Sequence, residues 1–196
     1  MITALRVLLF LTFLALAPAQ ADSLRGTGSL GLVVERAAGS VLIVDVAARR
    51  TIGRVQGLGD LSHASAVFSP DQRYAYVFAR DGGLTKVDLL TASIAKRVVQ
   101  AGNAIGGAIS DDGELIAVSN YEPGGVRVFS ADTLEPVADI AAVGSNGKAS
   151  KTVGLVDLPG RRFAFALYDA GEIWVADLAA AGAPVVEKLT GVGKLP

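Results

Sequence analysis

The chain has 196 residues, of which 51% are hydrophobic and 19% charged, with 23 glycines and no cysteine. This composition is typical of a globular protein and excludes an intrinsically disordered chain. The lack of cysteine excludes a disulfide framework, a thiolate metal site and a cysteine nucleophile. A formal net charge of −1 gives no electrostatic reason to expect a nucleic acid or an anionic membrane as a partner.

The first 21 residues have the pattern of a secretory signal peptide. Arg6 is followed by an apolar run from Val7 to Ala17 and then by Ala19-Gln20-Ala21, a small-residue cleavage signal. The run is short for a membrane span, and no cysteine follows it that could carry a lipid. We predict a signal peptide at 1–21 and a soluble periplasmic domain at 22–196 without a membrane span. An uncleaved anchor is the alternative.

Short β-rich runs separated by Gly, Asp, Pro and Ser follow residue 22, and they repeat. Four similar runs are Val41–Asp45, Leu84–Asp88, Val126–Ser130 and Ile173–Asp177. Their last residues are 43, 42 and 47 residues apart. Each run is followed by a turn and a further predicted strand, at Thr51–Val55, Ile94–Val99, Pro136–Ile140 and Val185–Leu189. The repeat therefore contains at least two strands in constant phase.

The other half of the unit repeats as well, at Ala66–Val77, Gly107–Val118 and Gly154–Phe165. Each copy reads as a strand, a turn of Ser, Asp, Pro or Gly, and an alternating second strand, which in the first copy runs from Arg73 to Ala79. Four strands in about 40–45 residues are typical of a propeller blade. We predict an all-β fold, a partial β-propeller of roughly four blades whose first blade lacks its inner strand. We expect a truncated part of a longer propeller with two open sheet edges.

The phase of the repeat also predicts which loops share a face. Positions before the inner strand hold His63, Asn103 and Lys151, and positions between the second and third strands hold Arg36, Arg80, Tyr121 and Tyr168. Because these loops open on the same side of a propeller, we expect the seven residues around one mouth. Arginine binds carboxylates through two parallel hydrogen bonds, and imidazole is a common axial ligand of haem iron. The set suits a large, flat, anionic macrocycle, although each residue alone is also explained as a turn residue or a solvated cation.

Other motifs are weaker. Gly26–Gly31 matches G-x-G-x-x-G, but the dinucleotide fingerprint needs a strand before it and a helix after it. Asp111–Glu114 could suggest calcium, yet it occupies the same turn as Ser69-Pro70-Asp71 in the repeat. The serines beside His63 show no nucleophile-elbow context. Trp174 lies in a repeated strand and is expected in the core.

The run from His63 to Leu89 resembles the haem d1 domain of cytochrome cd1 nitrite reductase, and more closely still the NirF family of periplasmic haem d1 biosynthesis proteins. Leu24–Asp45, Ser119–Gly125 and Asp169–Asp177 are similar to that family too. The likeness covers the mature chain but only the N-terminal half of a family member. It implies an eight-bladed propeller, consistent with the expected truncation.

The resemblance implies a ligand, haem d1 or its iron-tetrapyrrole precursor. It implies that His63 binds or faces the iron, that Arg36 and Arg80 hold carboxylates, and that Tyr121 lies around the macrocycle. Repeat phase adds Asn103 beside them, and His63 is also the candidate catalytic group. The chain has no C-x-x-C-H motif and a single histidine, so nitrite reduction itself is not supported.

Three functions stay open at this point. The first is an enzyme of haem d1 assembly, for which an oxidoreductase step of dehydrogenase type is the candidate reaction. The second is a non-catalytic carrier of the tetrapyrrole, and the third is a periplasmic propeller that docks a protein. The resemblance names other haem d1 maturation proteins, or cytochrome cd1 nitrite reductase, as candidate protein partners.

Overall fold

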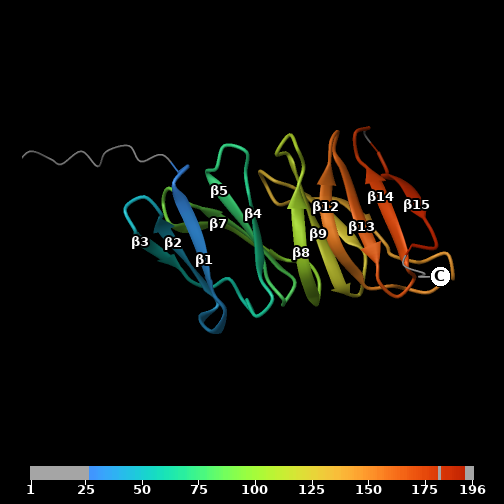
Figure 1. Cartoon of the computed structure of the whole chain (residues 1–196), viewed down its shortest axis with the longest axis horizontal. Helices are drawn as coiled ribbons and strands as arrows, with labels where there is room; N and C mark the ends of the chain where they lie inside the picture. The colour runs from blue at the N-terminus through green and yellow to red at the C-terminus, as the bar shows by residue number, and fades with distance from the viewer. Residues whose placement is uncertain (1–26, 181, 193–196) are drawn as a thin grey trace, which may run out of the picture.

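The computed structural model describes residues 27–180 and 182–192, and these form four antiparallel sheets that follow one another along the chain (Figure 1). The first sheet contains β1 (Leu30–Glu35), the 3-10 turn η1 (Arg36–Ala38), β2 (Ser40–Asp45) and β3 (Arg50–Val55). The second contains β4 (Ser65–Phe68), β5 (Tyr74–Phe78), β6 (Gly83–Asp88) and β7 (Ser93–Val99). The third contains β8 (Asn103–Ile109), β9 (Leu115–Glu122), β10 (Val126–Ser130) and β11 (Pro136–Ile140). The fourth contains β12 (Thr152–Leu158), β13 (Arg162–Leu167), β14 (Glu172–Asp177) and β15 (Val185–Leu189).

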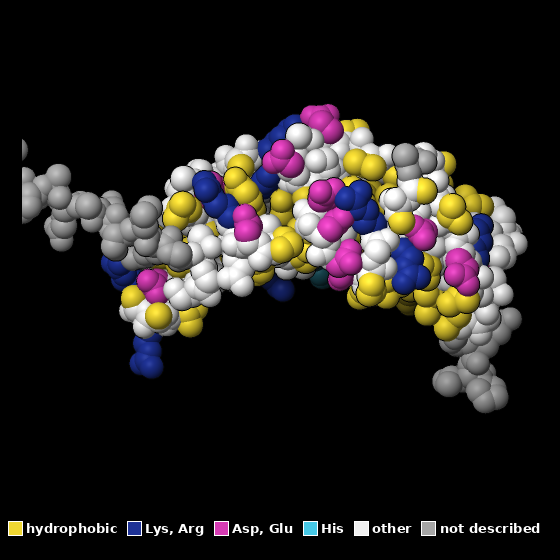
Figure 2. Space-filling model, turned by 90° about the horizontal axis from the view of Figure 1, so that it is seen from above, with side chains coloured by type: hydrophobic (Ala, Val, Ile, Leu, Met, Phe, Trp, Pro, Cys, Tyr) yellow, Lys and Arg dark blue, Asp and Glu magenta, His cyan; other side chains and the backbone are white. Residues whose placement is uncertain are grey.

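Each sheet is a meander in which consecutive strands pair, as in a propeller blade. The inner strands β4, β8 and β12 contact one another in sequence, and the sheets are arranged along an arc (Figure 2). The partial propeller is therefore confirmed. The repeated strand ends at Asp45, Asp88, Ser130 and Asp177 are also confirmed, as the last residues of β2, β6, β10 and β14.

Within the described residues the first sheet has three strands, which correspond to the outer three of each later sheet. An inner strand of the first blade would precede β1, in residues 1–26, which lie outside the described residues. The predicted signal peptide, residues 1–21, lies outside the described residues. The part of the chain that the structure describes contains no helix long and apolar enough to cross a membrane.

The turn that joins the first two strands of a blade is built from the same contacts in two copies. Ser69 Oγ donates a hydrogen bond to Asp71 Oδ1 at 2.5 Å and accepts one from the Tyr74 amide at 2.9 Å. In the next blade, Ser110 Oγ donates to Asp112 Oδ1 at 2.6 Å and accepts from the Leu115 amide at 2.9 Å. Side-chain hydrogen bonds of this kind favour turns over continued strands. They explain Asp111–Glu114 as a turn, in line with its repeat phase.

Three clusters of buried hydrophobic side chains fill the spaces between successive sheets. In β5, Ala75 and Val77 pack toward the first sheet, whereas Tyr76 and Phe78 pack toward the third. Four of the five β5 residues are therefore buried. The predicted alternation of buried and exposed residues from Arg73 to Ala79 is wrong, because a sheet between two neighbours has no solvent face.

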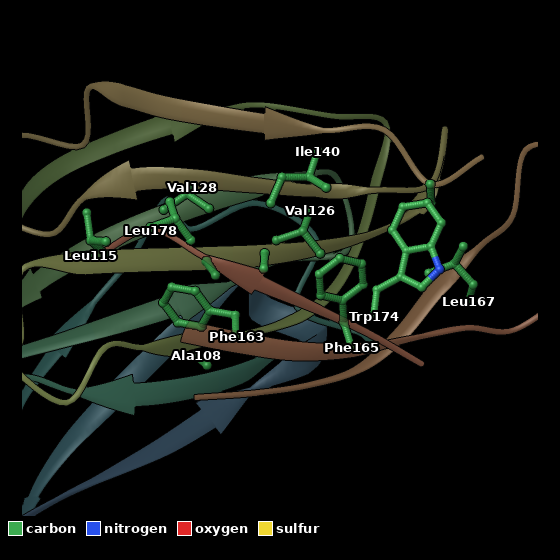
Figure 3. Close-up of a cluster of buried hydrophobic side chains, with 13 residues drawn as sticks. Ala108, Leu115, Val126, Val128, Ile140, Phe163, Phe165, Leu167, Trp174 and Leu178 are labelled. Carbon is green, nitrogen blue, oxygen red and sulfur yellow. The ribbon is translucent and has the colours of Figure 1, made fainter. Parts of the chain in front are cut away.

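The cluster between the third and fourth sheets contains the largest rings (Figure 3). Phe165 and Trp174 lie with ring centroids 6.2 Å apart at an interplanar angle of 58°, a tilted arrangement that aromatic quadrupoles favour. Trp174 is 3% exposed, and its Nε1 donates to Glu172 Oε2 at 2.8 Å. The expected core position of Trp174 is confirmed.

Candidate functional site

A cavity of about 280 Å³ opens between the second and third sheets. Its lining residues are His63, Arg80, Asn103, Ala104, Ile105 and Tyr121. His63 lies in the turn before β4 and Arg80 in the turn between β5 and β6, while Asn103 begins β8 and Tyr121 lies near the end of β9. Four of the residues that repeat phase placed around one mouth are thus brought together by the fold.

Two of these positions differ in detail from the sequence prediction. Asn103 and Tyr121 were expected in connecting loops, but each belongs to a strand, because β8 and β9 continue to the rim of the cavity. The register of this pair shifts on either side of Ala104, and Asn103 lies opposite Glu122. These shifts mark β-bulges, which commonly redirect side chains next to functional sites.

Arg36 does not line this cavity. It lies on η1, the connection of the first sheet that corresponds to the Arg80 turn of the second, and it is exposed. Its guanidinium forms no hydrogen bond or ion pair with the described residues. The structure therefore places Arg36 on an equivalent connection of the neighbouring blade rather than at the cavity wall.

The loop of His63 and the turn of Arg80 are tied together by Asp60, a residue that the sequence analysis missed. The Arg80 amide donates to the Asp60 carbonyl oxygen at 2.8 Å, and the Ser62 amide donates to Asp60 Oδ1 at 2.9 Å. The hydrogen bonds from Ser62, followed by the positive charges of Arg80 and His63, lower the pKa of the Asp60 carboxyl. An Asp two residues before a Ser at a turn was the available sequence signal.

A hydrogen bond, an ion pair and close backbone packing hold the Arg80 turn in place. Asp81 Oδ1 accepts the Gly83 amide at 3.0 Å, and Asp81 Oδ2 pairs with Arg97 at 2.8 Å. Gly82 has φ of 79°, and a Cβ there would lie 1.8 Å from the Ala101 carbonyl oxygen. Only glycine fits that position.

By contrast, the reactive ends of the two basic side chains are available. Neither the His63 ring nor the Arg80 guanidinium forms a hydrogen bond with the described residues, and both residues are exposed. Within the described residues no group of three His, Cys, Asp or Glu side chains could by itself hold a metal ion. The donor set instead suits a ligand that brings its own metal, with one imidazole as axial donor and a guanidinium for a carboxylate.

Tyr121 forms the wall on the side of the fourth sheet. The residue before it, Asn120, is buried and exchanges two hydrogen bonds with the Gln100 amide, at 2.8 and 3.2 Å. Lys151 Nζ lies 5.1 Å from the centroid of the Tyr121 ring. Asp169, and then Tyr121, raise the pKa of the Lys151 ammonium.

Tyr168, also expected at the mouth, follows β13 and is 67% exposed. Its amide donates to the Lys151 carbonyl oxygen at 2.9 Å, which places it beside Lys151. It does not line the cavity. The expected mouth therefore divides into a cavity between the second and third sheets and a neighbouring group at the fourth.

The glycine-rich segment lacks the following helix of a dinucleotide site. Thr27-Gly28-Ser29 leads directly into β1, so a strand follows where the dinucleotide fingerprint requires a helix. The context that the dinucleotide fingerprint needs is therefore not formed at this loop, in line with the weak weight of the motif.

A larger groove of about 650 Å³ lies elsewhere, between the outer strands β7 and β11. Its polar side chains are mostly engaged with each other, as in the Lys96–Glu135 and Arg127–Asp139 ion pairs at 2.8 and 3.0 Å. It contains no imidazole. We therefore give the smaller cavity priority as the functional site, because its polar groups are free and convergent.

Three comparisons with known proteins agree with this architecture. Residues 25–196 match the cytochrome D1 heme domain family. The chain is 58% identical over 190 residues to Protein NirF of Pseudomonas aeruginosa, covering 96% of this chain and 48% of that protein. It is 58% identical over 175 residues to Protein NirF of Stutzerimonas stutzeri, covering 88% and 45%.

A solved structure, dihydro-heme d1 dehydrogenase NirN in complex with DHE, matches with a TM-score of 0.79 and 31% identity. The match covers 92% of this chain and 38% of that one. The chain thus spans about half the length of the curated NirF proteins it matches. The family match covers nearly all of the chain, and the fold agrees with it. The chain therefore belongs to the cytochrome D1 heme domain family.

Proposed function

We propose that this chain acts in haem d1 biosynthesis by binding a d1-type iron tetrapyrrole precursor at the cavity between its second and third sheets. The observation that carries the proposal is the convergence of His63, Arg80, Asn103 and Tyr121 on one cavity, with the imidazole and the guanidinium free of hydrogen bonds to the described residues. The similarity to two NirF proteins and to a dihydro-heme d1 dehydrogenase in complex with DHE supports it.

Each residue has a proposed role. When bound, an iron tetrapyrrole would supply a metal centre that an imidazole nitrogen could hold. His63 provides that imidazole, or holds a proton next to the macrocycle if the chain is catalytic. Arg80 binds a carboxylate of the macrocycle, and Arg36 binds a second from the first sheet. Tyr121 provides a flat wall for the macrocycle, and Asn103 provides a side-chain amide beside it.

Asp60 positions this site. Its carbonyl oxygen holds the Arg80 turn, and its carboxylate lies in the field of His63 and Arg80. The cavity of about 280 Å³ is close to the lower end of the usual range for small-molecule sites, about 300–1,000 Å³. It accommodates part of a macrocycle, and the remaining contacts come from the neighbouring connections.

A periplasmic location is part of the proposal and rests on the predicted signal peptide at 1–21. Association with other haem d1 maturation proteins or with cytochrome cd1 nitrite reductase is part of it as well. Fractionation of expressing cells and N-terminal sequencing test the location. A mature N-terminus near Asp22 in the periplasmic fraction is the expected result, and an intact Met1 would contradict it.

The binding proposal is tested by absorption titration of the purified chain with a d1-type iron tetrapyrrole. We expect a shift of the ligand bands that is lost in His63→Ala and restored by added imidazole, because the chain has one histidine. Arg80→Met should weaken binding about tenfold, the usual scale for a hydrogen bond to a charged group. Arg162→Met is the matched control. Arg162 is the first residue of β13 and Tyr168 follows the last, so Arg162 lies at the end of the strand away from the mouth.

The same variant separates the two functions that the sequence left open. Loss of turnover in His63→Ala, with the macrocycle still co-purifying with the chain although the band shift is lost, supports an enzyme of haem d1 assembly. Normal transfer of the macrocycle to a partner without turnover supports a carrier. An unchanged ligand spectrum on mixing with the parent chain would overturn both.

A further inference from the structure

The group next to the cavity, formed by Tyr121, Lys151 and Asp169, contains a cation whose backbone is firmly held while its ammonium is not. The Lys151 amide donates to Asp169 Oδ2 at 2.9 Å, and the Lys151 carbonyl oxygen accepts hydrogen bonds from the Tyr168 amide at 2.9 Å and Ser150 Oγ at 3.1 Å. The Asp169 amide in turn donates to Ser150 Oγ at 2.9 Å. Four hydrogen bonds thus fix the position from which the lysine side chain extends.

The ammonium itself has no contact of comparable strength. Lys151 Nζ is 3.6 Å from Asp169 Oδ1, longer than a normal hydrogen bond, and the two side chains are 38% and 43% exposed. Such a pair contributes little free energy in water. Lys151 Nζ also lies 5.1 Å from the centroid of the Tyr121 ring, and Tyr121 is a wall of the cavity.

These contacts give the mouth an anion-binding position on its fourth-sheet side. Lys151 precedes β12 as His63 precedes β4, so it lies on the same rim one blade beyond Asn103. On the second-sheet side of the cavity, the positive charge comes from the Arg80 guanidinium. An anionic macrocycle that covers the face of Tyr121 would bring its far edge toward Lys151 Nζ.

We propose that Lys151 is a specificity-determining residue that exchanges its loose pairing with Asp169 for a peripheral carboxylate of the bound macrocycle, and so selects ligands rich in carboxylates. The inference rests on the proposed function, because it needs a macrocycle at this mouth. A flexible ammonium suits this task, since it can follow a carboxylate over several ångströms, whereas a guanidinium acts best in a fixed bidentate geometry. Asp169 is the competitor that keeps the cation in place before binding.

The test uses three iron porphyrins that share a ring and differ in carboxylates: the octacarboxylate iron uroporphyrin, the tetracarboxylate iron coproporphyrin and the dicarboxylate iron mesoporphyrin. Dissociation constants are measured by absorption titration at low and high salt. Lys151→Met should weaken binding of the octacarboxylate about five- to tenfold, and binding of the dicarboxylate less than twofold. The salt dependence for the octacarboxylate should fall as well.

Three further variants keep the result interpretable. Lys151→Arg should retain most of the affinity, and Asp169→Asn should strengthen octacarboxylate binding about two- to fivefold by releasing the ammonium. Lys96→Met removes the same charge from the outer strand β7, where Lys96 pairs with Glu135, and should match the parent chain.

Equal dissociation constants for Lys151→Met and Lys96→Met with all three porphyrins would overturn the inference. If the parent chain then still shows His63-dependent bands, the proposed function stands and only the role of Lys151 is lost. If the parent binds none of the three porphyrins, the proposed function and the inference fail together. Circular dichroism of each variant confirms that the fold is retained.

Discussion

The second and third sheets have neighbours on both sides, whereas the fourth has a described neighbour on one side only. In β9 of the third sheet, Ile116 and Val118 pack against the second sheet while Leu115 and Ala117 pack against the fourth. In β13 of the fourth sheet, Phe163, Phe165 and Leu167 are buried, and the two alanines between them are half-buried. The same repeat unit therefore has different burial at different places in the arc, because burial depends on the neighbour rather than on the strand itself.

The difference extends to the candidate site. The cavity forms where two fully packed sheets meet, and its lining comes from both of them. Arg36 and Tyr168 hold equivalent repeat positions on the first and fourth sheets, but they stay exposed and do not join it. A site made of side chains from two blades thus requires the packing between those blades.

The largest expected effect is a loss of stability when isoleucine is replaced by alanine on a covered face of a sheet, compared with the same replacement on an open face. Ile116 is fully buried between the second and third sheets, so Ile116→Ala should lower the free energy of unfolding by about 3–4 kcal/mol. Ile173 alternates with the buried Trp174 and lies on the open face of the fourth sheet; Ile173→Ala should cost about 1 kcal/mol or less. Urea unfolding measures both. Equal costs would show that the open face is covered in solution.

The free energy of unfolding should also depend on pH through a side chain at the junction between the second and third sheets. Tyr76 reaches from β5 to the third sheet, where its hydroxyl donates to the Ala131 carbonyl oxygen at 2.7 Å. Burial, and then the charge of Asp132, raises its pKa to about 12 from 10.0. The folded state therefore holds this proton more tightly than the unfolded chain. The resulting stability is complete below pH 10 and is lost as the pH rises toward 12.

The size of this loss is about 2–3 kcal/mol, since each pKa unit corresponds to about 1.4 kcal/mol. Urea unfolding between pH 8 and about 12 measures it as the difference between the parent chain and Tyr76→Phe. Tyr168→Phe, at an exposed ring on the fourth sheet, is the control and should follow the parent profile. A constant difference between the parent and Tyr76→Phe over this range would contradict the prediction.

The smallest of the three effects concerns close approach between sheets. A Cβ at Gly107 of β8 would lie 2.3 Å from the Phe78 ring and 2.4 Å from the Ala117 carbonyl oxygen. Gly107→Ala should destabilise the chain by about 2 kcal/mol through overpacking. Gly102→Ala is the control, because nothing lies within 4 Å of its added Cβ. If both variants unfold at the same urea concentration, the two sheets are less closely packed than the structure indicates.

Much of the architecture could be predicted because it is local. The ends of β2, β6, β10 and β14 and the bounds of β11 and β15 follow from a repeat of strand-forming residues punctuated by turn residues. The error in β5 has a physical cause, since Tyr74–Phe78 reads as alternating only if one face is assumed to meet water. Of the seven residues that repeat phase placed around one mouth, the fold brings four to one cavity, and their roles stay predictions.

The sequence by itself determined the blades, their phase and the rim on which His63 lies, because strand propensity and turn chemistry act over a few residues. Only the tertiary structure decided which rim residues share a cavity, that Asp60 ties the His63 loop to the Arg80 turn, and that Lys151 lies against Tyr121. Those relations join residues from different parts of the chain, and they depend on how closely one sheet packs on the next. Packing of that kind is set by the whole arc and not by any single repeat.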